Sequence, residues 1–175
     1  MNIYLFWIKN SYLSLYLEYS FSMETLDKID RKILKLLQTD GRLSNAEMAQ
    51  KVNLASATCY RRTQRLIQDG YIQGFRAMIN PKAVERETLV MVGVVLDRST
   101  PDSFRAFEAA IKKLSFVLDC YLVAGDFDYF LKMRVRDIKD FNKLHAEKLI
   151  AFPGVRQIRS FFAMKEVTDN EPLDF

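Results

Sequence analysis

The residues best suited to chemistry lie between Ser44 and Gly70, a stretch with the pattern of two short helices joined by a tight bend. At about 100° per residue, one side of the second helix carries the small or apolar Cys59, Thr63, Leu66 and Gly70. The side roughly opposite carries Thr58, Arg61, Arg62, Arg65 and Gln68. Guanidinium and amide groups pair with phosphates and base edges, so the pattern predicts a recognition helix for a DNA major groove. The alternative is a solvated amphipathic helix, because runs of charge are usually solvent-facing.

A second candidate group is Gly125, Asp126 and Asp128. A free amino acid needs a carboxylate for its ammonium group and N–H donors for its carboxylate, and an aspartate-flanked glycine turn supplies both. The residues alone favour a simpler interpretation, in which the glycine makes a turn and Asp128 caps a strand. A catalytic acid–base pair or a magnesium site is disfavoured, since no phosphate loop, nucleophile or third ligand accompanies the two aspartates.

Composition narrows the class of protein. The chain of 175 residues is 49% hydrophobic, which suits one or two small domains, and its net charge of +4 favours an anionic partner. Cys59 and Cys120 lie far apart without metal-ligand spacing, so we expect two buried thiols, no disulfide and no metal. The lone His145 is interpreted as structural or exposed. A cytoplasmic setting, no cofactor and no membrane partner are expected.

Residues 1–22 differ from the rest of the chain in being rich in Tyr, Leu and Ile. They lack the basic start and small-residue cleavage site of a signal peptide, and their apolar run is far shorter than the roughly 20 residues of a spanning helix. They are interpreted as an over-extended reading frame preceding Met23, or as an apolar arm that covers a neighbouring subunit.

Residues 23–79 have the pattern of a winged helix-turn-helix domain. We expect a helix over Thr25–Gln38, capped by Thr25 or Asp27, and a second helix beginning at Ser44, which forms a capping box with Glu47. A recognition helix runs from near Ser56 to Asp69–Gly70, and Tyr71–Ile79 is expected to be a β segment. Residues 80–87 are interpreted as a hinge.

Residues 88–167 predict a ferredoxin-like βαββαβ domain, which makes the fold α+β, with a tail at 168–175. The expected strands are Leu89–Leu96, Val117–Ala124, Asp128–Val135 and Val155–Lys165, with helices after Thr100 and around Phe141–Phe152. Two helices on one face leave the other face of the sheet open. That face includes the apolar Val123, Phe130 and Phe161, so we expect a second subunit to cover it.

Three stretches resemble the Lrp/AsnC family of leucine-responsive and asparagine-synthase regulators. They are LDKIDRKILKLLQTDGRLSNAEMAQKVNL, RLIQDGYIQGFRAMINP, and LVAGDFDYFLKMRV with FPGVRQIRSFFAMKEV, so the likeness covers about Leu26 to Val167. The resemblance implies a DNA-binding domain, an amino-acid-sensing domain, and dimers that assemble into octamers or larger particles. It implies an amino acid such as leucine as effector, bound in clefts between dimers.

The resemblance also suggests site residues. For double-stranded DNA we expect Ser44, Asn45, Ser56, Thr58, Arg61, Arg62 and Arg65, with Arg62 and Arg65 as the main contacts. For the effector we expect Leu122, Ala124, Gly125, Asp126, Asp128, Ile138, Phe161, Phe162 and Ala163. Helix capping at Ser44 and sheet packing at Ile138 and Phe161–Ala163 explain those residues equally well.

The sequence departs from the family at the start of the recognition helix. Many members have Ser-Pro-Ser/Thr-Pro there, whereas this chain has Ala55-Ser56-Ala57-Thr58, so Ser56 is expected to take over as N-cap. Two functions follow. The first is a regulator of amino-acid metabolism that binds AT-rich, imperfectly palindromic promoters and is not an enzyme. The second is an amino-acid-binding regulatory subunit of an enzyme, without DNA binding.

Overall fold

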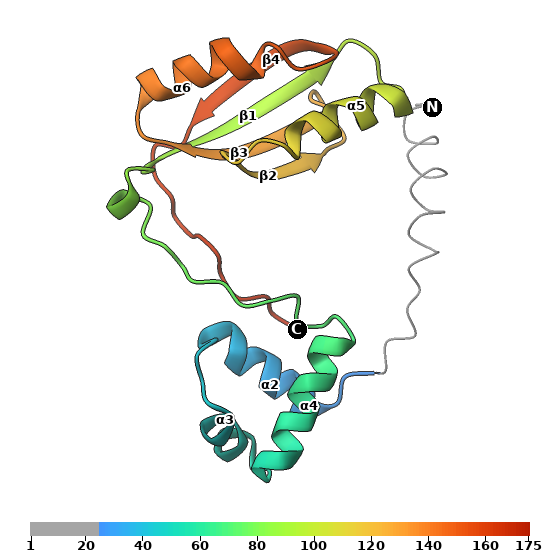
Figure 1. Ribbon diagram of the computed structural model, residues 1–175, viewed down its shortest axis with the longest axis vertical. Helices are drawn as coiled ribbons and strands as arrows, with labels where there is room; N and C mark the ends of the chain where they lie inside the picture. Colours follow the sequence, from blue (N-terminus) through green and yellow to red (C-terminus); the bar gives the residue numbers. More distant parts are fainter. Residues whose placement is uncertain (1–24) are drawn as a thin grey trace. The chain divides into compact units, whose positions relative to one another are not determined.

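The computed structural model describes residues 25–175, so the expectations for residues 1–22 lie outside the described part (Figure 1). The described chain forms two compact units. The first comprises residues 25–76 together with Asn170–Phe175, and the second is Ala77–Asp169. The last six residues therefore belong with the N-terminal helices and not with the domain that precedes them.

The first unit contains α2 (Lys28–Thr39), α3 (Asn45–Val52) and α4 (Ser56–Gln68). Helix α2 begins at Lys28 because the side chain of Asp27 accepts hydrogen bonds from the backbone N–H groups of Ile29 and Asp30. The capping box of Ser44 and Glu47 is confirmed at the start of α3. Asn53 ends that helix in the left-handed conformation, with φ 56°, which allows the tight bend before α4.

The core of this unit is formed by one apolar side of each helix. Its fully or nearly buried members are Ile33 and Leu34 of α2, Met48, Ala49 and Val52 of α3, and Cys59 and Leu66 of α4. Because these side chains meet at helical spacing, the three helices hold a fixed arrangement in which α4 has one inner and one outer side.

Two expectations about this unit are wrong. Helix α4 has Ala55 as its N-cap, without a side-chain cap, and Ser56 is its first residue. Residues 71–79 form no strand, because a single extended segment needs a neighbouring strand to satisfy its backbone groups and the described residues of this unit offer none.

The second unit follows the expected βαββαβ order. Its elements are η1 (Lys82–Val84), β1 (Thr88–Leu96), α5 (Pro101–Ile111), β2 (Val117–Leu122), β3 (Tyr129–Val135), α6 (Ile138–Leu144) with the π-helical turn η2 (His145–Leu149), and β4 (Val155–Phe162). Strands β2 and β4 end two and three residues earlier than expected, and β3 begins one residue later.

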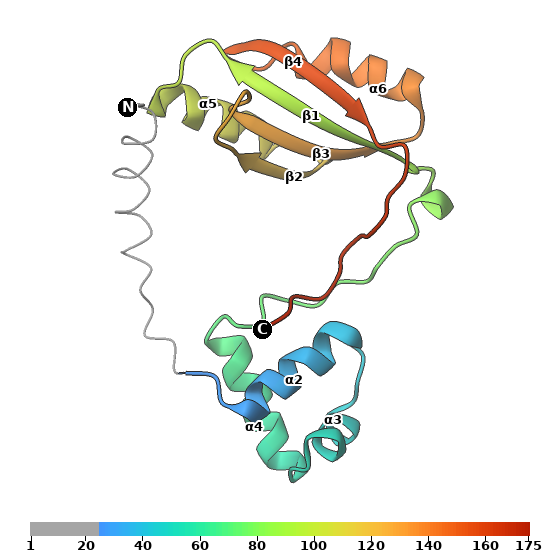
Figure 2. The same cartoon turned by 180° about the vertical axis from the view of Figure 1, so that it is seen from behind.

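The four strands form an antiparallel sheet in the order β2-β3-β1-β4, seen from two sides in Figures 1 and 2. Val92 lies opposite Leu131 in the register of the central pair, and both are fully buried. Phe107 of α5 and Phe141 of α6 pack into the same core as these strand residues, so both helices cover one face. This arrangement confirms the ferredoxin-like prediction.

The opposite face carries aromatic side chains that include Tyr121, which lies opposite Phe130 in the register, and a cluster of three phenylalanine rings. The rings of Phe127, Phe130 and Phe161 form a triangle. The Phe127 centroid lies 5.0 Å from that of Phe130 and 6.1 Å from that of Phe161, and the last two are 6.4 Å apart. The Phe127 ring sits directly over Gly93, where a Cβ would lie only 2.6 Å from Cδ1 of Phe127. We call Phe127, Phe130 and Phe161 the aromatic face. Of the two cysteines, Cys59 is buried as expected, whereas Cys120 on the edge strand β2 is exposed.

Candidate nucleic-acid interface and effector site

The inner side of α4 is joined to α2 by a cluster of charges around Asp30, which is buried. Arg62 donates from Nη1 to both Asp27 (2.6 Å) and Asp30 (2.9 Å), and Arg65 donates from Nη2 to the other carboxylate oxygen of Asp30. The pKa of Asp27 lies below its usual value, chiefly because the Asp30 backbone N–H donates to its carboxylate, with Arg62 adding to the effect. Asp27 in turn raises the pKa of Arg62. The cluster fixes α4 on α2.

The expectation that Arg62 faces away from the core is therefore wrong. Arg62 follows Cys59 by three residues, which places it only about 60° from the fully buried cysteine on a helix of 100° per residue. Its side chain is 27% exposed and is held by internal carboxylates. Sequence reasoning missed Asp30 as the partner, although an acid on the stripe of α2 could have signalled it.

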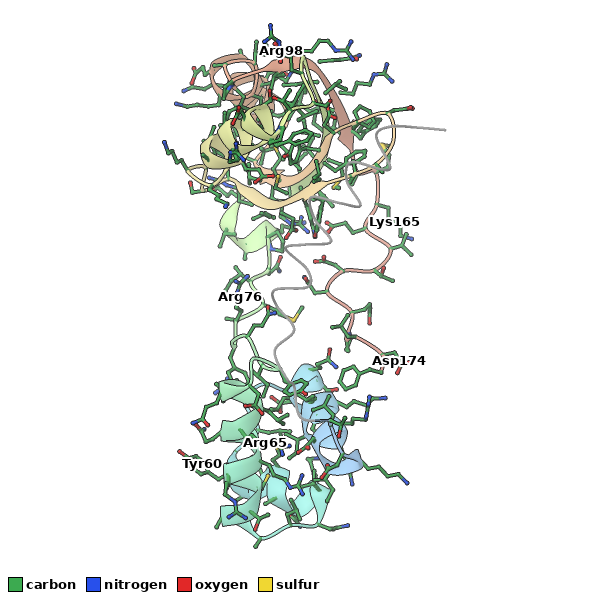
Figure 3. All side chains as sticks on the ribbon, turned by 90° about the vertical axis from the view of Figure 1, so that its right-hand side faces the viewer. Tyr60, Arg65, Arg76, Arg98, Lys165 and Asp174 are labelled. Atoms are coloured by element: carbon green, nitrogen blue, oxygen red, sulfur yellow. The ribbon has the colours of Figure 1, made fainter. Side chains whose placement is uncertain are left out.

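Arg65 has the same orientation. Figure 3 shows it on the α2 side of α4, whereas Tyr60 points away from the unit. The assignment of Arg62 and Arg65 to DNA stays a prediction, but their ion pairs favour a role in holding the helices together. The basic side chain that α4 presents outward in its first two turns is Arg61, which is exposed.

The outer side of α4 is a mixed surface that the helical spacing of the sequence predicted only in part. Its exposed residues are Ser56, Ala57, Tyr60, Arg61, Ile67 and Gln68, with Gln64 partly exposed between them. Tyr60 is 57% exposed, and neither it nor Gln64 was predicted from the sequence. The spacing of Tyr60 and Gln64, four residues apart and away from Cys59, is the signal that could have found them.

The residues expected to hold the DNA backbone are partly used inside the protein. The hydroxyl of Ser44 donates to Glu47 Oε2 at 2.7 Å and accepts from the Glu47 backbone N–H, which is ordinary capping. The Ser44 hydroxyl, and next its backbone N–H, which donates to the same Oε2 at 2.9 Å, lower the pKa of the Glu47 carboxyl group. Asn45 donates from Nδ2 to the Ser56 carbonyl at 2.9 Å, which joins the first residue of α3 to that of α4.

At the start of α4, the backbone N–H groups of Thr58 and Cys59 both bond to the Ala55 carbonyl. Ser56 is the exposed first residue of α4. It therefore lies in the N-terminal turn, which carries the partial positive charge of the helix dipole. Thr58 is half-buried in the same turn. An anion can therefore reach the exposed first residues of α4 more readily than it can reach Thr58.

The residues expected to bind an effector do not all meet in one place within the unit, although the Phe161 ring lies 6.1 Å from that of Phe127, the residue between Asp126 and Asp128 in the sequence. Leu122, Ala124, Gly125, Asp126 and Asp128 lie in or beside the connection from β2 to β3. Ile138 follows the other end of β3, and the Ala163 backbone N–H bonds to the Leu89 carbonyl near the start of β1. The seven residues of β3 separate these two groups by about 20 Å at 3.3–3.4 Å per residue.

Within the first group, Asp128 has a structural function. One oxygen of its carboxylate accepts the Leu96 backbone N–H at 2.8 Å, and the other accepts from the Ser99 hydroxyl at 3.5 Å. This is the strand-capping interpretation that the residues alone favoured. Asp126 is exposed in the turn beside Gly125, whose φ is 149°. Asp126 is thus the carboxylate of this group with room for a ligand.

Phe161 and Phe162 face opposite sides of the sheet, as neighbours in a strand do. Phe161 belongs to the aromatic face, whereas the ring of Phe162 lies 5.2 Å from that of Phe141 of α6. The two residues cannot line the same side of one site, so the structure separates a pair that the sequence had grouped together.

Comparisons with known proteins identify both units. Residues 26–73 match a family model described as winged helix-turn-helix DNA-binding, and residues 89–173 match the Lrp/AsnC ligand binding domain. The leucine-responsive regulatory protein of Salmonella typhimurium is 45% identical over 148 residues, which cover 85% of this chain and 90% of that protein. The protein of that name from Escherichia coli K12 is 44% identical over the same share of each chain.

Solved structures agree with these matches. A transcriptional regulator from Neisseria meningitidis in complex with L-Met superposes with a TM-score of 0.82 at 32% identity, covering 86% of this chain and 97% of that one. An AsnC family regulator from Agrobacterium tumefaciens gives 0.81 at 30% identity, covering 85% and 97%.

These relatives are transcriptional regulators and not enzymes, and no comparison supports a regulatory subunit of an enzyme. In residues 25–175 no helix is both long enough and apolar enough to cross a membrane. With both domains matched in order and relatives at 45% identity, the chain belongs to the Lrp/AsnC family of transcriptional regulators.

Proposed function

We propose that this regulator reads double-stranded DNA with the outer side of α4, with Arg61 and Tyr60 as its main contacts. The observation that carries the proposal is the division of the arginines on α4: Arg61 is exposed, whereas Arg62 and Arg65 bond to the buried Asp30. A guanidinium group already held by a buried carboxylate must give up that bond to reach a base. Arg61 reaches DNA without such a cost.

The test is an affinity measurement on a duplex selected by the parent protein from a random library. Arg61→Ala is expected to weaken binding by about 1–3 kcal/mol, or roughly 5- to 150-fold, without lowering the melting temperature. Arg105→Ala, which removes an exposed arginine from α5 of the other unit, is the matched control and should bind like the parent. Parental affinity in Arg61→Ala would refute the assignment of Arg61.

We further propose a small amino acid as effector, with leucine and methionine as the first probes. Support comes from the match to a ligand binding domain, from relatives named leucine-responsive, and from a structural neighbour solved with L-Met. Asp126 is proposed to bind the ammonium group, because Asp128 is already bonded to Leu96 and Ser99.

The proposed site lies between two copies of the chain. Its two groups of residues are about 20 Å apart in one unit. We therefore propose that the turn at Gly125–Asp126 of one subunit meets the Ile138 and Ala163 end of another. Such a site requires more than one copy of the chain, and we propose a homodimer that assembles further, to an octamer or larger, in a cytoplasmic regulator.

Calorimetry with leucine and with methionine tests the proposal. Asp126→Asn is expected to weaken binding about tenfold or more, since a hydrogen bond to a charged group contributes about 1.5–3 kcal/mol. Asp102→Asn, an exposed aspartate of α5, should leave the affinity unchanged. Equal affinities for all three proteins would contradict the assignment of Asp126. Equal DNA affinity with and without a bound amino acid would contradict the effector function.

A further inference from the structure

The end of the chain returns to the DNA-binding unit. Residues Asn170–Phe175 are grouped with α2, α3 and α4, although they follow β4 of the ligand-binding unit. The chain therefore passes between the two units twice, once near Arg76 and once near Asp169. After the second passage, residues Asn170–Phe175 are attached to the N-terminal unit only by non-covalent contacts with α2.

Gln38 of α2 binds the main chain of this segment with both ends of its amide group. The Leu173 backbone N–H donates to Gln38 Oε1 at 2.7 Å, and Gln38 Nε2 donates to the Leu173 carbonyl at 3.1 Å. One side chain thus satisfies both polar groups of one residue, in the way that a neighbouring strand does in a sheet. This contact binds the backbone of Leu173, and it thereby positions Asp174 and Phe175, the two residues that follow.

Lys35, one turn before Gln38 in α2, contacts both Asp174 and Phe175. Its Nζ lies 3.3 Å from the Asp174 carboxylate and 5.6 Å from the centre of the Phe175 ring. Asp174 is fully exposed, so this ion pair contributes little by itself. Phe175 is only 39% exposed, although it is a large ring at the end of an extended segment. The ring and the Gln38 amide carry most of the contact.

The ring lies in a shallow groove along one side of α2. The groove has a volume of about 430 Å³ and is lined by Lys28, Arg31, Lys32, Lys35, Leu36, Thr39 and Phe175 itself. Four of these residues are cations at helical spacing on one side of the helix. A segment with a carboxylate and an aromatic ring matches such a surface, because cations attract both groups. Figure 3 shows Asp174 beside α2, and Tyr60 on the outer side of α4.

We propose that this groove on α2 is a peptide-docking site whose occupant is the chain's own Leu173–Phe175 segment, with Gln38 binding the main chain and Lys35 the carboxylate and ring. Docking in the same chain is favoured because the covalent connection supplies a high effective concentration, which lets a few weak contacts hold the segment. The docked segment gives the DNA-binding unit a second, reversible attachment to the chain that follows β4.

Zero-length carbodiimide cross-linking of the full-length protein tests the proposal. A cross-link between Lys35 and Asp174 is expected by mass spectrometry, alongside a reference cross-link between Lys132 and Asp169, whose charged atoms are 3.4 Å apart in the other unit. Gln38→Ala should lower the yield of the Lys35–Asp174 cross-link roughly two- to tenfold, which corresponds to the loss of hydrogen bonds of about 0.5–1.5 kcal/mol. The yield of the Lys132–Asp169 cross-link should stay unchanged. Gln50→Ala, an exposed glutamine of α3, is the matched control.

Mixing ¹⁵N-labelled and unlabelled chains identifies the occupant. Docking within one chain gives cross-linked peptides that are wholly labelled or wholly unlabelled, whereas docking between chains gives mixed pairs. In an equal mixture, mixed pairs at the statistical share of about half of the total would overturn the proposal in favour of a second copy. Equal yields in the parent and Gln38→Ala would overturn the docking site. Hydrogen–deuterium exchange of residues 170–175 gives a second measure, and it should be faster in Gln38→Ala.

Discussion

Arg62 of α4 and Asp30 of α2 form an ion pair in which Nη1 lies 2.9 Å from a carboxylate that is almost completely buried. The pair connects α4, the helix that we propose contacts DNA, to α2, the helix that carries the proposed docking groove. Breaking a buried pair leaves an uncompensated charge, which costs more than the pair contributes when intact. The position of α4 is therefore sensitive to either residue.

Arg62→Ala is expected to destabilise the DNA-binding unit by about 1–3 kcal/mol, since Arg65 still neutralises part of the charge on Asp30. Denaturant unfolding of the full-length protein, combined with hydrogen exchange in α2 and α4, measures the change. Arg61→Ala is the control and should keep parental stability. If Arg62→Ala unfolds like the parent but loses DNA affinity, then Arg62 is a DNA contact and its structural role is refuted.

Acid should weaken the same unit through Asp27. In the folded state the pKa of Asp27 is lower than its ordinary value of 3.8, chiefly because the Asp30 backbone N–H donates to its carboxylate. The ionised carboxylate therefore stabilises the fold at pH values above 3.8. That stabilisation is lost as the pH falls from 3.8 through the lower pKa of the folded state. Asp27→Asn keeps a capping side chain but not the charge, and its stability should vary less with pH in this range.

Circular dichroism melts between pH 2.5 and 6 would measure this difference. Asp102→Asn, in α5 of the other unit, should keep the parental pH dependence. A parental pH dependence in Asp27→Asn would show that the Asp27 charge does not stabilise the fold.

Gly93→Ala should strain the ligand-binding unit. The added Cβ would lie within 2.9 Å of three ring atoms of Phe127, so the ring must move, at a cost of about 1–3 kcal/mol. The double variant Gly93→Ala with Phe127→Leu should recover part of this loss, because leucine leaves room for the methyl group. Thermal unfolding measures both. Additive effects of the two substitutions would show that the contact is not the source of the strain.

Phe161→Glu should reduce the size of the assembly, because it places a charge on the aromatic face that we expect a second subunit to cover. Sedimentation velocity measures the change at constant protein concentration. Phe175→Glu, which alters an aromatic residue of the other unit, should keep the parental size. A parental sedimentation coefficient in Phe161→Glu would show that this face is not the interface.

The sequence by itself determined the helices and strands and their order, apart from the strand expected at residues 71–79, which does not form. The capping box at Ser44 and Glu47, the stripe at Phe104–Leu114 and the alternation in Tyr129–Val135 are local patterns, because period and capping depend on residues a few positions apart. The three quoted stretches were also sufficient for the family. These features survive because no distant contact competes with them.

The tertiary structure decided which polar and charged side chains have no partner inside the described protein and can bind DNA or an effector. Arg62 pairs with Asp30, 32 residues away, and Asp128 accepts from the Leu96 backbone, also 32 residues away, so both groups assigned to ligands from the sequence already have partners inside the protein. The separation of Phe161 from Phe162 and the contact of Leu173 with Gln38 depend equally on long-range packing. A charged group binds whichever partner the fold brings nearest, and helical or strand spacing does not contain that information.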